Sequence, residues 1–196
     1  ISAGKAFDFG DKKVNYFDNA FNSLINFELK WNAAQLETEA VFKRYSDILN
    51  SELKGFGVLN YLSSHDDGQP FDAAREKPFE TATKLLLCPG TSQVYYGDES
   101  ARSLDTQGDA TLRSNMNWND IQNNPETKAI LNHWQKLGQF RANHPAIGAG
   151  VHQMITQKPY LFYRSYQKED YKDLVVVGLD LPKGEKKLDV SKVFEE

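Results

Sequence analysis

One stretch, residues 56 to 68, constrains the fold of this chain more than any other. From Phe56 to Leu62 it is mainly apolar and lacks polar alternation, which predicts a short strand buried on both faces. The run ends in Ser63-Ser64-His65-Asp66-Asp67-Gly68. Buried strands that deliver ionisable groups at their carboxyl ends build the active sites of α/β barrels. The alternative is a strand followed by an ordinary polar turn, because Ser, Asp and Gly are common turn formers.

A second stretch of similar kind follows about thirty residues downstream, the usual span of one helix and its connections in a strand–helix–strand unit. Pro89-Gly90 ends a predicted helix, and Gln93 to Tyr96 form a predicted strand. Asp98 and Glu99 follow that strand. The chain therefore has two predicted strands in succession that end in acidic residues.

Together the two stretches resemble the alpha-amylase superfamily of glycoside hydrolases. In that family the seventh barrel strand ends in Asn-His-Asp, and the eighth carries Gly-x-x-x-Tyr-Tyr-Gly-Asp-Glu. Gly90 and the run from Tyr95 to Glu99 match the second pattern, and His65-Asp66 match the first. Ser64 stands where most members have Asn, which affects one hydrogen bond around the histidine.

Other segments are similar to the same family in the same order. They are Phe17-Asp18-x-x-Phe21 with Asn26-Phe27, then Asp109-x-x-x-Arg113-x-x-Met116-x-Trp118, and Arg141 to Ile147. Asn115 stands where the family usually has Pro. The resemblance thus extends over nearly the whole chain.

Periodicity predicts helices at residues 35–53, at 78–88 and from Pro125 onward, and residues 160–166 and 174–181 predict an antiparallel hairpin. Their predicted inner positions are Val41, Tyr45, Ile48 and Leu49 in the first helix, Phe79, Ala82 and Leu86 in the second, and Ile130, Trp134 and Leu137 in the third. The resemblance implies an α/β fold: residues 1–148 as the C-terminal portion of a (β/α)8 TIM barrel, with about strands six to eight and their helices. Residues 149–196 would then be the start of a small antiparallel β domain.

The resemblance also implies roles for two residues. Asp66 corresponds to the carboxylate that stabilises the transition state, and His65 to the histidine that binds the substrate. Retaining cleavage needs a nucleophile and an acid/base carboxyl about 5 Å apart. The sequence has no Gly-x-Arg-x-Asp strand for the nucleophile and no Gly-Glu strand end for the acid. We therefore expect part of a retaining α-1,4-glucan hydrolase that is inactive as this chain alone.

Three alternatives remain open from the sequence. The parent protein could be a non-catalytic glycan-binding or scaffold relative of the family. It could instead be a transglycosylase or an isomerase, since these members share the same residues. An unrelated α/β domain with acidic turns is the third alternative.

Composition excludes several partners. The net charge is −4 without a cluster of Lys or Arg, so neither nucleic acid nor an anionic membrane surface is indicated. No apolar run is long enough to span a bilayer. The expected partner is an α-glucan oligosaccharide or polysaccharide. A partial barrel would also leave a sheet face and edges uncovered, which predicts self-association or pairing with a missing N-terminal piece.

No metal or other cofactor is expected in this chain, because its His, Asp and Glu residues show no metal-ligand spacing. Calcium in the parent protein would be held chiefly by upstream residues, as the resemblance implies. The single cysteine, Cys88, excludes an intrachain disulfide and is expected in the core. The chain does not reveal its compartment, although an α-glucan substrate slightly favours an extracellular or periplasmic one.

The remaining ionisable groups are expected to be structural or solvated. Asp67 and Asp72 lie near Arg75 in a predicted loop, and a solvated loop with a local ion pair is expected there. The resemblance implies a mainly structural role for Asp98 and Glu99. Structural or solvated roles are also expected for His133, His144 and His152.

Overall fold

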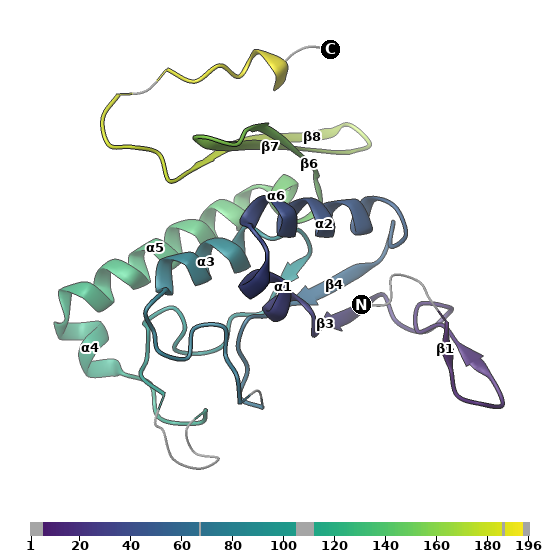
Figure 1. Cartoon of the computed structure of the whole chain (residues 1–196), viewed down its shortest axis with the longest axis horizontal. Coiled ribbons are helices and arrows are strands. Elements are labelled where there is room, and N and C mark those ends of the chain that lie inside the picture. The colour runs from purple at the N-terminus through teal and green to yellow at the C-terminus, as the bar shows by residue number, and fades with distance from the viewer. Residues whose placement is uncertain (1–5, 67, 105–111, 186, 194–196) are drawn as a thin grey trace.

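The computed structural model describes residues 6–66, 68–104, 112–185 and 187–193. These residues form three layers: a parallel sheet, a layer of helices, and an antiparallel sheet on the far side of the helices (Figure 1). After a short antiparallel pair of strands within residues 7–14, parallel β–α units come first along the chain and the antiparallel sheet follows. Within the described residues, no helix combines the length and apolar character needed to cross a membrane.

The parallel sheet has three strands in the order β3-β4-β5: Ser23–Asn26, Gly57–Asn60 and Thr91–Ser92. The predicted strand at residues 56–62 is confirmed in shorter form. The predicted strand at residues 93–96 is wrong, because β5 lies two residues earlier and the chain turns after Tyr95. Gly97 allows this turn with a φ of +90°, and a β-carbon there would clash with Arg102.

The helix predicted at residues 35–53 is confirmed in shorter form, and a second, unpredicted helix precedes it. They are α1, Leu29–Gln35, and α2, Thr38–Asn50. The chain is extended at Leu36 and Glu37, which separates them. At the predicted inner face of α2, Val41 and Tyr45 are buried, whereas Ile48 and Leu49 are partly buried against a second apolar cluster.

The next helix, α3, runs over Pro78–Leu86. Ala82 and Leu86 are buried as predicted, but the prediction for Phe79 is wrong, since its side chain is 46% exposed. Phe79 lies in the first turn of the helix, where its ring packs on His133 with centroids 5.0 Å apart. Buried Thr81 and Leu85 share the inner face instead.

Three helices follow the parallel sheet: α4, Trp118–Asn123, α5, Pro125–Asn143, and α6, Pro145–Ala149. Asn124 caps α5, accepting hydrogen bonds from the backbone N–H of Glu126 at 2.8 Å and of Thr127 at 3.4 Å. Ile130 and Trp134 are buried as predicted, and Leu137 packs against the same core.

The antiparallel sheet has the order β6-β7-β8, with strands Val151–Thr156, Tyr160–Lys168 and Tyr171–Leu179. The predicted hairpin is confirmed, but its strands are longer and its turn is limited to Glu169 and Asp170. Strand β6 was not predicted, because its sequence, Val-His-Gln-Met-Ile-Thr, is short and follows a helix directly. The division into domains at residues 148–149 stays a prediction.

The main core joins the helices to the antiparallel sheet. It includes Phe42 of α2, Leu85 of α3, Ile147 of α6, and Phe162 and Val175 of the sheet. Cys88 is fully buried in this core, as expected, and burial raises the pKa of its thiol to about 12. The short remaining elements are β1, Phe7–Asp8, β2, Lys13–Val14, and a 3₁₀ turn at Ser191–Val193.

Candidate functional site

Buried amide side chains align the carboxyl ends of the parallel strands. Asn26, the last residue of β3, donates from Nδ2 to Oδ1 of Asn60 at 2.8 Å. Asn60, the last residue of β4, donates from its own Nδ2 to the carbonyl of Pro89 at 2.7 Å. These two amides thereby connect both strands to the segment that enters β5. The residues that follow β3 and β4 are delivered to one edge of the sheet.

The two residues predicted for the site lie in the turn after β4 and contact each other. His65 Nε2 is 3.1 Å from Asp66 Oδ2. Arg113 donates from Nη2 to the other oxygen, Asp66 Oδ1, at 2.5 Å. The side chains of His65, Asp66 and Arg113 are 56%, 72% and 51% exposed, so these pairs add little stability and leave the groups open to a ligand. Asp67 and Asp109 lie outside the described residues.

A pocket of about 310 Å³ opens beside Asp66. Its volume is at the lower end of the range for small-molecule sites. The pocket combines aromatic rings with a carboxylate, an ammonium group and a hydroxyl. Its lining residues are Phe27, Lys30, Trp31, Tyr61, Ser64 and Asp66. A larger cavity of about 830 Å³ opens at the amino ends of β4 and β5, lined in part by Gly57, Thr91 and Arg141, and so lies away from the predicted site residues.

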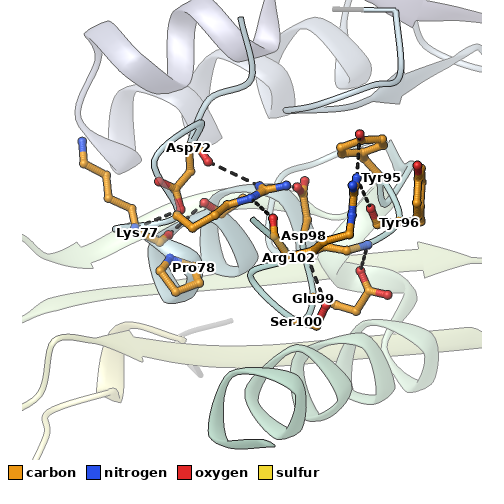
Figure 2. A network of polar contacts seen from close by, with 12 residues as sticks. Asp72, Lys77, Pro78, Tyr95, Tyr96, Asp98, Glu99, Ser100 and Arg102 are labelled. Atoms are coloured by element: carbon orange, nitrogen blue, oxygen red, sulfur yellow. Dashed lines mark hydrogen bonds and ion pairs between the residues drawn. The ribbon is translucent and has the colours of Figure 1, made fainter. Parts of the chain in front are cut away.

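Figure 2 shows a polar network that includes the buried residues Asp72, Asp98 and Arg102. Arg75 donates from Nη1 to Asp98 Oδ1 at 2.6 Å and from Nε to the carbonyl of Arg102 at 2.8 Å. Burial raises the pKa of Asp98, and the charge of Arg75 opposes that rise. Glu99 accepts a hydrogen bond from the backbone N–H of Gly97 at 2.8 Å. Asp98 and Glu99 are therefore held by structural contacts, as expected.

Of the two acids predicted near Arg75, Asp72 does not form the local ion pair. Asp72 is 5% exposed, and its carboxylate accepts from the backbone N–H of Glu76 and of Lys77, each at 2.9 Å, just before α3. Negative charge near the amino end of a helix is favourable, because the free N–H groups there carry partial positive charge. Arg75 reaches past Asp72 to the more deeply buried Asp98.

Arg102 fixes the segment that carries Arg113. Its buried guanidinium donates to Tyr95 Oη at 2.8 Å and to the carbonyl of Ser114 at 3.1 Å. It also lies 4.3 Å from the centroid of the Tyr96 ring, and Tyr96 Oη donates to the same Ser114 carbonyl at 2.9 Å. Since Ser114 is the neighbour of Arg113, these contacts support the position from which Arg113 meets Asp66.

The other histidines have structural contacts. His152 is fully buried between Glu39 and Arg164, and His144 pairs with Asp173 at 3.0 Å. His133 packs on Phe79. Among the described residues, no cluster of three or more His, Cys, Asp or Glu side chains is arranged to hold a metal ion.

The sequence of this chain is similar to that of known proteins. No family model matches the chain. The periplasmic alpha-amylase of Escherichia coli strain K12 is 39% identical to it over 178 residues, which cover 88% of this chain and 25% of that protein. This chain is a relative of the alpha-amylase family of glycoside hydrolases. The chain corresponds to the C-terminal portion of proteins of that family.

A second sequence relative and a solved structure are also similar to this chain. The cyclomaltodextrinase of a Bacillus species is 25% identical over 147 residues, covering 70% of this chain and 25% of that protein. A cyclic alpha-maltosyl-(1→6)-maltose hydrolase from Arthrobacter globiformis, solved with that sugar, shares the fold with a TM-score of 0.58 at 22% identity, over 83% of this chain and 38% of its own. The alpha-amylase relative described here thus spans a quarter of the length of each of the two sequence relatives.

Sequence reasoning missed several residues of the site in this alpha-amylase relative. Lys30, Trp31 and Tyr61 line the pocket, but none stands in a motif that marks a binding residue. Arg113 was noted within a family-like segment, yet its contact with Asp66 spans 47 positions of sequence. One sequence signal for the pocket was present. Phe27 directly follows β3, and so lies at the same edge of the sheet as His65, which closely follows β4.

Proposed function

We propose that this chain is the part of a retaining α-glucan hydrolase that holds the sugar at the cleavage site through Asp66 and His65. The relationship to alpha-amylases supports the reaction class. In this proposal β3, β4 and β5 with their helices are strands six to eight of a TIM barrel. The β6-β7-β8 sheet then begins the small β domain that follows the barrel.

One observation carries the proposal. Asp66 lies at the carboxyl end of the parallel sheet, beside His65 and Arg113, and its side chain lines a pocket with aromatic walls. A carboxylate there can accept hydrogen bonds from sugar hydroxyls, and His65 and Arg113 can donate to others. Bonds that strengthen as the ring distorts toward the oxocarbenium-like transition state lower the barrier to cleavage. Asp66 acts in this proposal as a stabilising group and not as the nucleophile.

Binding without cleavage is the expected behaviour of the chain alone. Retaining hydrolysis needs two further carboxyl groups about 5 Å apart. Of the six pocket-lining residues, all within the described part, Asp66 is the one acid. The proposed chemistry needs no cofactor in this chain, and calcium in the parent protein would be bound by residues outside it.

Titration with maltotetraose tests the proposal. Saturation-transfer NMR, which detects weak binding, should show maltotetraose bound to the chain and cellotetraose, its β-linked isomer, not bound. Asp66→Asn should weaken maltotetraose binding about tenfold, because the charge that accepts the hydroxyl bonds is lost. Asp170→Asn, the same chemical change in the β7–β8 turn, should leave binding unchanged.

Two results would contradict the proposal. One is equal affinity of the Asp66→Asn chain and the unchanged chain. The other is turnover of maltotetraose by the chain that disappears in Asp66→Ala, since hydrolysis would then need no further carboxylates.

A further inference from the structure

We propose that Trp31 is the aromatic platform on which a glucose residue of the α-glucan stacks beside Asp66. The inference rests on the proposed function and deepens it, because it names the residue of the same pocket that recognises the face of the sugar ring. Trp31 is 48% exposed and lines the pocket together with Asp66.

The position of Trp31 is set by the buried face of α1. Leu29 and Ala33 are fully buried in the main core and anchor that face. Because an α-helix turns about 100° per residue, Trp31, two positions from each, lies on the opposite side. Asn32 adds a tertiary anchor, donating from Nδ2 to Tyr45 Oη at 2.8 Å. The indole is therefore presented to the pocket by a helix that is fixed from behind.

The surroundings of Trp31 suit a sugar ring, which has apolar C–H faces and a rim of hydroxyl groups. Phe27, 66% exposed, meets Tyr61 edge-to-face with centroids 6.0 Å apart and extends the apolar wall. The Lys30 ammonium lies 4.2 Å from the centroid of the Trp31 ring in a cation–π contact, and Lys30 lines the same pocket. Asp66 supplies acceptors on the same pocket. Aromatic rings with a few placed polar groups are the usual composition of a small-molecule site.

An alternative is that Trp31 packs against another part of the protein, but this explains its polar neighbours less well. Apolar packing needs no exposed carboxylate beside the ring, and removing the charged Asp66 group from water by such a contact would be costly. A sugar, in contrast, contacts the aromatic ring with its C–H face and the carboxylate with its hydroxyl groups.

Calorimetry and fluorescence of the full chain with maltotetraose test the platform. Trp31→Ala should weaken binding about tenfold, whereas Trp31→Phe should keep most of the affinity because a flat ring remains. Maltotetraose should change the tryptophan fluorescence of the unchanged chain. In Trp31→Phe this fluorescence change should be absent, although calorimetry should still detect binding. Trp118→Ala is the matched control, because Trp118 is 66% exposed at the start of α4 and lies outside this pocket.

The outcomes separate the two proposals. If Asp66→Asn weakens binding and Trp31→Ala does not, the platform is wrong and the proposed function stands. If Trp31→Ala and Trp118→Ala weaken binding equally, the platform is also wrong. If the unchanged chain binds no maltotetraose, both proposals fail. Circular dichroism of each variant distinguishes loss of the platform from loss of the fold.

Discussion

A buried ion pair between Arg75 and Asp98 shows how single residues support the candidate site. The side chains of Arg75 and Asp98 are 8% and 1% exposed, so neither charge is well solvated without the other. Arg75 also donates to the carbonyl of Arg102, whose guanidinium in turn holds Ser114 beside Arg113. The exposed residues of the site therefore depend on buried charged residues that contact no ligand.

Removing Arg75 should destabilise the fold. Arg75→Ala leaves the buried Asp98 carboxylate without its partner, and breaking a buried pair typically costs about 3–5 kcal/mol. The pKa of Asp98, already raised by burial, should rise further. Urea unfolding measures the free energy. Arg44→Ala, which breaks an exposed pair with Glu28, should cost less than about 1 kcal/mol. Equal losses in both variants would contradict the role of Arg75.

At the scale of elements, a buried chain of polar groups joins α2 to the antiparallel sheet. Arg164 of β7 donates from Nε to Nδ1 of His152 of β6 at 3.1 Å. Because Arg is always a donor, Nδ1 carries no proton, and Nε2–H donates to Glu39 of α2 at 2.8 Å. Tyr160 donates to the same carboxylate at 2.6 Å. The structure thus requires a neutral His152.

Stability should fall in mild acid because of His152. Burial first, and then the charge of Arg164, lower the pKa of His152, while the bond to Glu39 opposes the shift and Lys43 reinforces it. The folded chain therefore binds a proton less readily than the unfolded chain. Stability is fully present above the ordinary histidine pKa of about 6.5 and is lost as the pH falls below it toward the lowered pKa.

Urea unfolding at pH 7.5 and at pH 5.5 measures this loss. His152→Gln should be less stable at pH 7.5 but should lose less stability on acidification than the unchanged chain. His133→Gln, which alters a partly exposed histidine whose pKa burial also lowers, should keep most of the pH dependence. An unchanged pH dependence in His152→Gln would rule out His152 as its source.

For the whole molecule, much of the fold was predictable because it depends on local pattern. The strand at β4, the capped helix α5 and the β7–β8 hairpin follow from apolar periodicity, from Asn124-Pro125 and from two strand-like runs. The break at Leu36 and Glu37, the early β5 and the exposure of Phe79 depend on tertiary contacts and were missed. In the site, a motif indicated Asp66 and His65, whereas Lys30, Trp31 and the contact of Arg113 with Asp66 require knowledge of the fold.

The open face of the parallel sheet should drive self-association of the chain. Alternation along β3 buries Asn26 and places Ile25 on the other face, where it is 47% exposed. Exposed apolar sheet faces and edges are common sites of association. Sedimentation velocity should show species that grow with concentration, and Ile25→Lys should reduce them. Leu174→Lys, on the antiparallel sheet, should have a smaller effect. A monomer at every concentration contradicts this prediction.

The most direct test of the central claim is chemical-shift mapping of the labelled chain with maltotetraose. We expect shifts that cluster at His65, Asp66, Arg113 and the Trp31 indole, together with intact maltotetraose at the end of the titration. Shifts centred instead on Lys54 and Arg141, which line the larger cavity, would contradict an α-glucan site at Asp66.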